Sequence, residues 1–247
     1  MTPQFKPKAL IFDLMGTCTN WHPTIQTALS TTPSLTHLAP EVHAQIASSW
    51  REGFFQEIHR RFRAGLGTES IDVTHRRVLD GVLDGVDSVA GGGEGIVGEE
   101  ERERLVHAWH FQDAWPDSID AIMRLKEEYM VVVLANGTTR LQLDLIQSSR
   151  IPFHTLFSSQ LLGLTKPDPA IYRKALDLMQ VEPEEAVMVA AHAYDLRAAK
   201  GVGMRTVYIY RRTEDLDEDM EAVRRDVDVF LDGEGPLGQL AEMLCGE

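Results

Sequence analysis

Short apolar runs alternate with helical patterns along most of the chain, and this alternation constrains the fold more than any other feature. Runs that are rich in Val and bounded by polar residues or Gly predict buried strands. They cover residues 9–14, 130–134, 186–190, 205–210 and, as a weaker edge candidate, 226–231. Between these runs, apolar residues recur at three- and four-residue spacing, which predicts helices. The helical patterns cover residues 118–129, 169–179, 194–202 and 237–244.

Alternating strands and helices imply a parallel sheet with helices on both faces. We therefore predict an α/β fold with a doubly wound, Rossmann-like parallel sheet. Ligands of such sheets collect at the carboxyl ends of the strands. Asp13, Asn136, Lys166 and Asp195 occur at such ends or shortly after them, so we expect their side chains to meet.

A second, helical unit is predicted between the first strand and the rest of the sheet. Residues 21–110 contain no convincing buried strand, but residues 40–63 and 99–109 have helical patterns. We predict a helical cap over residues 21–110 and a core formed by residues 1–20 and 111–247. Residues 81–98 are rich in Gly and Asp and include three consecutive glycines, which predicts a flexible loop inside the cap.

Charge and cysteine content limit the partners and the location that we expect. The net charge is −14, which argues against nucleic acid and anionic membranes as partners, so a small-molecule substrate is expected. Cys18 and Cys245 are the only cysteines, too few for a disulfide framework or a zinc site. No apolar run near the N-terminus is long enough for a signal peptide or a membrane span. We expect a cytoplasmic protein.

Asp13 is the first candidate for chemistry. It comes directly after a buried strand and is followed by Gly16 and Thr17, an arrangement that exposes a carboxylate as a nucleophile while backbone N–H groups orient it. An Asp after a strand is also a common turn former. Three more motifs follow in order: Ala135-Asn136-Gly137, Lys166-Pro167-Asp168 and Ala191-His192-Ala193-Tyr194-Asp195. Together the four resemble the motifs of the haloacid dehalogenase superfamily.

Met15 departs from the pattern of the superfamily's phosphatases. Phosphatases of that superfamily use a second Asp, two residues after the nucleophile, as the general acid and base. Met15 stands at that position, and a thioether cannot carry protons at neutral pH. The fourth motif offers only Asp195 as a carboxylate, which is a poor basis for a magnesium site. We therefore expect no metal and disfavour a phosphatase.

Further residues resemble the type II 2-haloacid dehalogenases, the branch that lacks the second Asp. They are the run Asp13-Leu14-Met15-Gly16-Thr17, the pair Trp50-Arg51, the segment Trp115-Pro116-Asp117, and Tyr172 six residues after Lys166. The resemblance implies that Asp13 displaces a halide to form an ester, which water then hydrolyses without any cofactor. It also implies a homodimer formed through the cap.

The same resemblance implies a role for each site residue. Lys166 would orient Asp13, and Asp195 would hold Lys166 and help to activate water. Thr17 and Asn136 would supply hydrogen bonds, and Arg51 would receive the departing halide. Tyr172 and His192 complete the expected substrate-binding set.

Three departures from the family leave other functions open. Ala135 and Ala190 replace serines, and His192 replaces an asparagine, so polar contacts to substrate or water are lost or changed. One alternative is a biosynthetic enzyme in which protonated Asp13 opens or rearranges an epoxide. The other is a catalytically inactive binding protein that keeps the fold.

Several of these residues also have purely structural interpretations. Arg51 lies beside Glu52 on a charged helix and could be solvated, and His192 could be a core histidine. Aromatic residues in and beside the cap are interpreted as packing: Trp21, Phe54, Phe55, Trp109 and Phe111. The charged run Arg211-Arg212 with Glu214-Asp215 is interpreted as solvated surface.

Overall fold

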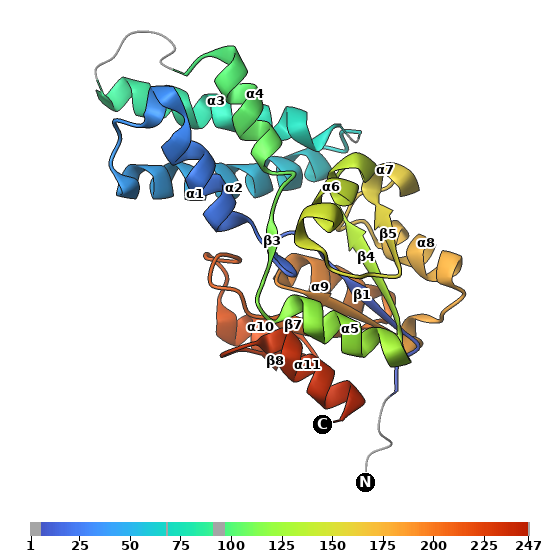
Figure 1. Cartoon of the computed structure of the whole chain (residues 1–247). Helices are drawn as coiled ribbons and strands as arrows, with labels where there is room; N and C mark the ends of the chain where they lie inside the picture. The colour runs from blue at the N-terminus through green and yellow to red at the C-terminus, as the bar shows by residue number, and fades with distance from the viewer. Residues whose placement is uncertain (1–5, 68, 91–96, 247) are drawn as a thin grey trace. The chain divides into compact units, whose positions relative to one another are not determined.

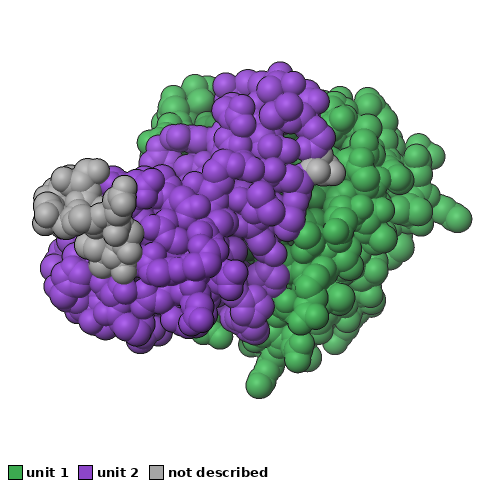
Figure 2. Space-filling view, turned by 90° about the horizontal axis from the view of Figure 1, so that it is seen from above, with its two compact units in different colours: residues 1–20, 113–247 green, residues 21–112 purple. Residues whose placement is uncertain are grey.

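The computed structural model describes residues 6–67, 69–90 and 97–246, except for the side chains of residues 86–90. The chain divides into two compact units (Figures 1 and 2). One comprises residues 1–20 with 113–247, and the other comprises residues 21–112. The second boundary falls two residues beyond the one that we expected from the sequence, so Phe111 and Gln112 belong to the cap unit and not to the core.

A parallel sheet of six strands forms the centre of the first unit, as far as the described residues show, with strand order β5-β4-β1-β6-β7-β8. The strands are β1 (Ala9–Phe12), β4 (Met130–Ala135), β5 (Thr155–Ser158), β6 (Ala186–Ala190), β7 (Arg205–Ile209) and β8 (Val229–Leu231). The predicted fold class is confirmed. The short strand β5 was missed, because a run of four residues that is only half buried has little apolar signal.

The sequence of β1 is a continuous apolar run because this strand is buried on both faces of the sheet. All four of its residues are buried, and successive side chains point to opposite sides of the sheet. Ile11, Val132 and Met188 share a core cluster with residues of α8 (Pro169–Met179) and α9 (Ala193–Val202). On the other face, α5 (Ser118–Glu128) and α11 (Pro236–Cys245) pack side by side (Figure 1).

The chain leaves and re-enters this unit through a small antiparallel ladder. Strands β2 (Thr19–Asn20) and β3 (Asp113–Ala114) pair with each other, so the departing and returning segments lie next to one another. The remaining elements of the unit are α6 (Thr139–Ser149), α7 (Ser159–Leu162), the 3₁₀ turn Pro183–Glu185 and α10 (Met220–Asp226).

The strand order places a topological switch point between β1 and β6. From β1 the chain continues to β4 on one side, and from β6 it continues to β7 on the other. In open parallel sheets, the crevice for a ligand opens at the carboxyl ends of the strands where the order reverses. Asp13 follows one of these two strands and His192 follows the other, so both lie at this edge.

The second unit is helical. It contains α1 (Trp21–Thr31), a 3₁₀ turn (Pro33–Leu35), α2 (Pro40–Arg63), α3 (Ile71–Ala90) and α4 (Glu99–Ala108). Helix α1 packs against α2 and α4, and α3 packs against the same two helices. The interior between them is aromatic, with Trp21, Trp50 and Trp109 fully buried.

The prediction of a flexible loop near residues 81–98 is wrong for the first half of this range. Helix α3 continues to Ala90, and residues 91–96 lie outside the described residues. Leu79 and Leu83 are buried on the inner face of α3, and their burial holds the helix together. Gly81 and Gly85 lie on this helix with open space around them, and each costs only about 1 kcal/mol relative to Ala.

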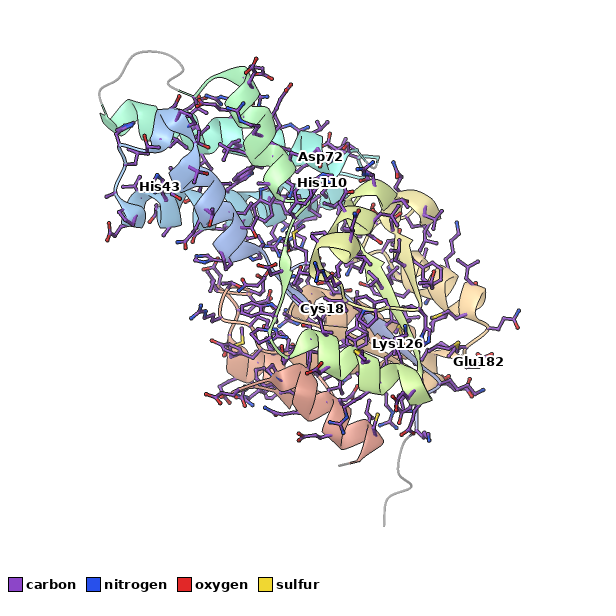
Figure 3. All side chains as sticks on the ribbon, in the orientation of Figure 1. Cys18, His43, Asp72, His110, Lys126 and Glu182 are labelled. Carbon is purple, nitrogen blue, oxygen red and sulfur yellow. The ribbon has the colours of Figure 1, made fainter. Side chains whose placement is uncertain are left out.

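In the part of the chain that the structure describes, no helix combines the length and apolar content that a membrane crossing requires. Both thiols are free, and Cys18 is buried (Figure 3).

Candidate active site

The carboxylate of Asp13 is held by the loop that follows β1. Its backbone N–H donates to the carbonyl of Val189 at 3.0 Å, which continues the sheet one residue further. The Thr17 hydroxyl donates to Asp13 Oδ2 at 2.7 Å and accepts from the backbone N–H of Ala191 at 2.9 Å. Thr17 is fully buried with both of these bonds made, so it orients Asp13.

Lys166 joins the two acidic residues that the sequence predicted to meet. Its Nζ lies 2.9 Å from Asp13 Oδ1 and also donates to Asp195 Oδ2. Lys166 is fully buried. The Asn136 side chain holds its main chain, accepting from the Lys166 N–H at 2.8 Å and donating to the Lys166 carbonyl at 3.0 Å. Asn136 is therefore placed to position Lys166, and its predicted contact with substrate stays a prediction.

Asp195 lies in the first turn of α9 and has both carboxylate oxygens engaged. Oδ2 accepts from Lys166, and Oδ1 accepts from the Tyr172 hydroxyl at 2.5 Å. Neither Asp195 nor Tyr172 is exposed at all. The Tyr172 hydroxyl therefore holds Asp195 inside the core, and the expected contact of Tyr172 with substrate stays a prediction.

These contacts set the protonation of the acidic pair. Burial raises the pKa of Asp13, but the charges of Lys166 and His192 and the hydrogen bonds from Lys166 and Thr17 outweigh it, so the net pKa lies below its ordinary value. Burial and the neighbouring Asp13 raise the pKa of Asp195 against the effect of Lys166. Burial opposes the charge of Lys166, yet Asp13 and Asp195 raise its pKa further above its ordinary value. Asp13 is thus a carboxylate paired with an ammonium.

The loop after β7 supplies residues that the sequence analysis misplaced. Arg211 and Glu214 are 6% and 3% exposed, so the prediction of a solvated charged surface is wrong for them. The Glu214 carboxylate packs over Gly16, where an added Cβ would lie 2.5 Å from Oε2. The sequence did contain a feature that places this loop near the site, because the loop starts at the carboxyl end of a predicted strand.

Arg211 ties the Asp13 loop to the segment that returns from the cap. Its Nη2 and Nη1 donate to the two oxygens of Asp117 at 2.9 and 3.2 Å, and its Nε donates to the Thr17 carbonyl at 3.1 Å. The guanidinium also stacks over the Trp115 ring, 4.9 Å from its centroid. The Trp115 indole N–H donates to the Gly16 carbonyl at 2.9 Å. The Trp115-Pro116-Asp117 segment therefore braces the nucleophile loop.

His192 is buried among acidic groups. Its Nε2 lies 3.6 Å from Asp13 Oδ2 and 3.6 Å from Glu214 Oε2, and its Nδ1 lies 3.4 Å from Asp215 Oδ1. Burial lowers the pKa of His192, but Asp215, Asp13 and Glu214 raise it to about 9. His192 is therefore buried, as its interpretation as a core histidine has it, and its acidic neighbours favour the charged ring. Its contact with substrate stays a prediction.

Arg51 belongs to the other unit and is 5% exposed, so its interpretation as a solvated helix residue is wrong. Its guanidinium lies over the Phe55 ring at 4.4 Å and near the rings of Trp21 and Trp109, at 5.5 and 5.8 Å. Trp21, Phe54 and Trp109 are buried, as expected for packing residues, whereas Phe111 is 48% exposed. Halide binding by Arg51 stays a prediction.

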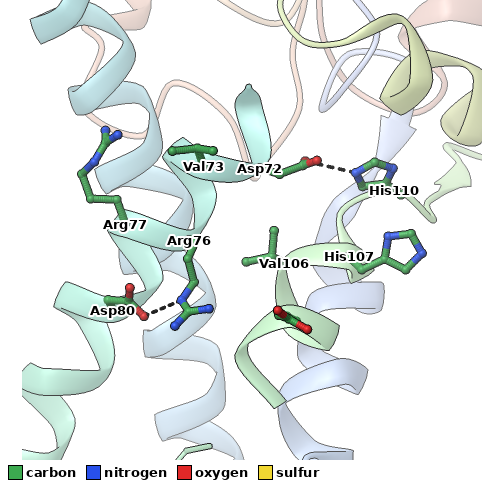
Figure 4. Close-up of a pocket in the computed structure, with 9 residues that line it drawn as sticks. Asp72, Val73, Arg76, Arg77, Asp80, Val106, His107 and His110 are labelled. Atoms are coloured by element: carbon green, nitrogen blue, oxygen red, sulfur yellow. Dashed lines mark hydrogen bonds and ion pairs between the residues drawn. The ribbon is translucent and has the colours of Figure 1, made fainter. Parts of the chain in front are cut away.

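A separate hollow of about 560 Å³ lies within the cap unit, between α3 and α4 (Figure 4). Its lining is mostly charged, and the charges already pair within the protein. Arg76 binds Asp80 and Glu99, Arg77 binds Glu57 and Glu69, and Asp72 lies 3.1 Å from His110. We assign no chemistry to this hollow, since its arginines and carboxylates neutralise one another.

The donor set around Asp13 does not suit the magnesium ion that phosphatases with this fold use. Lys166 Nζ occupies the space between Asp13 and Asp195, and Met15 offers a thioether where a hard cation needs oxygen. Within the described residues, no group of three or more His, Cys, Asp or Glu side chains is arranged to hold a metal ion.

Comparison with known proteins finds haloacid dehalogenases and phosphatases among the relatives. The chain is 32% identical to (S)-2-haloacid dehalogenase 4A of Burkholderia cepacia over 114 residues, which is 45% of this chain and 49% of the relative. It is 36% identical to glyceraldehyde 3-phosphate phosphatase of Pyrococcus furiosus over 107 residues, which is 41% of this chain and 45% of the relative. The chain thus spans about half the length of the curated relatives that it matches.

Solved structures match over nearly the whole chain. A defluorinating L-2-haloacid dehalogenase superposes with a TM-score of 0.82 and 28% identity, covering 98% of this chain and 97% of that one. Another L-2-haloacid dehalogenase superposes with a TM-score of 0.79 and 26% identity, covering 98% and 100%. The family model of haloacid dehalogenase-like hydrolases matches residues 7–203. With that match spanning most of its length, the chain belongs to the haloacid dehalogenase-like hydrolase family.

Proposed function

We propose that the protein hydrolyses the carbon–halogen bond of a small 2-haloacid through an ester on Asp13. The observation that carries this proposal is the contact of Asp13 with Lys166 at 2.9 Å, beside Met15 in place of a proton carrier. The arrangement provides an ionised nucleophile, and the thioether of Met15 cannot protonate a poor leaving group. A halide needs no protonation to leave, which favours a halide as the leaving group at this site.

The proposed reaction has two steps. In the first, an oxygen of Asp13 forms a bond to the carbon that bears the halogen, and the halide departs with the bonding electrons. In the second, water adds to the carbonyl carbon of the Asp13 ester, and the carbon–oxygen bond to that carbonyl breaks to release a 2-hydroxy acid. Lys166 stabilises the carboxylate before the attack and after the ester is hydrolysed, and Thr17 keeps it aligned.

The similarity to L-2-haloacid dehalogenases supports the substrate class, since it extends over 97% or more of each chain at 26% and 28% identity. Arg51 is the proposed halide partner. It is a buried cation with aromatic rings around its guanidinium, a weakly hydrated setting that suits a large, soft anion.

Phosphate ester hydrolysis is the second candidate, because a glyceraldehyde 3-phosphate phosphatase is among the relatives at 36% identity. Two observations count against it. The leaving alkoxide would need an acid where Met15 stands, and the carboxylate oxygens of Asp195 are already bound to Lys166 and Tyr172. Dehalogenation is therefore favoured.

The ionisation of Asp13 counts against the acid-catalysed alternative. Opening an epoxide with protonated Asp13 requires a raised pKa, whereas Lys166, His192 and Thr17 together bring the pKa of Asp13 below its ordinary value despite its burial. An inactive binding protein would have no need of a nucleophile paired in this way, so the enzymatic function is preferred.

The test is a single-turnover reaction with (S)-2-chloropropionate in heavy-oxygen water, with chloride measured and the Asp13 peptide weighed. We expect chloride release and one heavy oxygen in the Asp13 carboxylate. Asp13→Asn should release no chloride in the first turnover, and Asp144→Asn, which changes a buried carboxylate on α6, should behave as the parent. Turnover of p-nitrophenyl phosphate with Mg²⁺, without chloride release from any 2-haloacid, would replace this proposal with the phosphatase.

A further inference from the structure

Two carbonyl groups of the loop that carries Asp13 are held by side chains from distant parts of the chain. The Trp115 indole N–H donates to the Gly16 carbonyl at 2.9 Å, and Arg211 Nε donates to the Thr17 carbonyl at 3.1 Å. Among the described residues, the backbone hydrogen bonds within the loop use neither of these carbonyls. The direction of both carbonyls therefore depends on Trp115 and Arg211.

Gly16 cannot set the direction of its own carbonyl. It has φ +85°, and glycine restricts the backbone around it less than any other residue does. The peptide between Gly16 and Thr17 is therefore fixed by the bond that its carbonyl accepts. Trp115 is a well-anchored donor, because its backbone N–H donates to the Cys18 carbonyl at 3.0 Å and its ring lies under the Arg211 guanidinium, 4.9 Å from the centroid.

Thr17 in turn sets the plane of the Asp13 carboxylate. The terminal torsion of an aspartate is broad, and the ammonium of Lys166 has donors that rotate, so Lys166 holds the charge of Asp13 better than it holds the plane. The Thr17 hydroxyl donates to Asp13 Oδ2 at 2.7 Å. Its direction is defined by a second bond, because it also accepts from the Ala191 N–H at 2.9 Å.

We propose that Trp115 is a positioning residue for the displacement of the halide. By holding the Gly16 carbonyl, Trp115 fixes Thr17, and Thr17 keeps the Asp13 carboxylate in the plane from which it attacks. This inference rests on the proposed function and adds to it a residue that acts through its neighbours. A nucleophile that is misaligned reacts more slowly with bound substrate, whereas the affinity for substrate changes little.

Rapid-quench reaction of the full chain with (S)-2-chloropropionate tests this role. Trp115→Phe keeps an aromatic ring beside Arg211 and removes the donor. We expect chloride release at saturating substrate to be at least about 10-fold slower, with the half-saturating concentration unchanged. The concentration dependence of the first turnover gives both values.

Tyr129→Phe is the matched control for the loss of one bond to a carbonyl. The Tyr129 hydroxyl donates to the Leu244 carbonyl at 2.8 Å. Tyr129 directly precedes β4, so it lies at the amino edge of the sheet, whereas Asp13 follows the carboxyl end of β1, which is parallel to β4. Tyr129→Phe should therefore release chloride at the parent rate.

A double-mutant cycle shows whether Trp115 acts through Thr17. Thr17→Val keeps the shape of the side chain and removes its hydroxyl, so it should already include most of the loss that Trp115→Phe causes. In the Thr17→Val protein, adding Trp115→Phe should slow chloride release by less than about 2-fold. A further loss of the full 10-fold would overturn the proposed route.

The outcomes separate this inference from the function on which it rests. A parent protein that releases no chloride refutes the proposed function, and the role of Trp115 falls with it. A parent that turns over, with Trp115→Phe equally fast or changed only in its half-saturating concentration, overturns the role of Trp115 alone. If Trp115→Phe does not fold, benzothienylalanine at position 115 takes its place, because it keeps the two-ring shape and replaces the N–H with sulfur. The same results are then expected.

Discussion

The carboxylate of Glu214 fills the space into which a side chain at Gly16 would project, although the two residues are far apart in the sequence. An added Cβ at Gly16 would lie 2.5 Å from Glu214 Oε2 and 2.8 Å from Oε1. Gly16 also has φ +85°, where side-chain-bearing residues are strained. The glycine after the nucleophile is therefore required both by its own backbone and by the loop that follows β7.

Gly16→Ala should lower both stability and activity. The strained backbone and the displaced Glu214 together should cost about 2 to 4 kcal/mol in free energy of unfolding. Gly65→Ala is the matched control, because Gly65 has φ +63° but nothing within 4 Å of an added Cβ. Urea denaturation gives both values, and equal losses would show that the contact with Glu214 does not matter.

The sequence predicted the core of this site because its parts obey local rules. A continuous apolar run predicts a strand buried on both faces, and parallel strands bring their carboxyl ends to one edge. Asp13, Lys166 and Asp195 therefore could be predicted to meet, and they do.

The loop after β7 could not be predicted in the same way. Mixed charges such as Arg211 and Glu214 are typical of solvated surface, and only the tertiary structure buries them, by pairing Arg211 with Asp117 and placing Glu214 over Gly16. Helix α3 shows the opposite effect, since packing of Leu79 and Leu83 outweighs the low helix propensity of its glycines.

The charge on His192 should make stability fall at alkaline pH. Its folded pKa of about 9 exceeds the ordinary value of 6.5, so its contribution is complete below pH 6.5 and is lost as pH rises through 9. The difference corresponds to a contribution on the order of 3 kcal/mol. Urea denaturation at a series of pH values should show this decline in the parent. His192→Gln should flatten it, and an unchanged slope would contradict the assigned charge.

His75 should make stability fall at acidic pH. It is fully buried between the rings of Phe54 and Trp109, with centroids 4.2 and 4.5 Å away, and neither ring nitrogen has a hydrogen-bond partner among the described residues. Burial, with Arg51 and His110 nearby, lowers its pKa well below 6.5, so its contribution is present above pH 6.5 and is lost as pH falls. His75→Phe should therefore stabilise the protein more at pH 5 than at pH 8. His37→Gln, at an exposed position, should not.

Arg211→Lys should lower the stability of the protein although the positive charge is kept. Lysine cannot bind both oxygens of Asp117, donate to the Thr17 carbonyl and stack on Trp115 at once. Because Arg211 is buried, we expect a loss of about 2 kcal/mol in free energy of unfolding. Loosening of Thr17 should also disturb its bond to Asp13 and slow chloride release.

The surface residue Arg197 provides the comparison for that change. It pairs with both oxygens of Glu218, but its side chain is 38% exposed, and such pairs contribute about 0 to 1 kcal/mol. Arg197→Lys should therefore leave stability and chloride release nearly unchanged. If the two substitutions lower the free energy of unfolding by the same amount, then burial of Arg211 against Asp117 is not what holds the nucleophile loop. A larger loss for Arg211→Lys, shrinking when Asp117→Asn is already present, would attribute the brace to that pair.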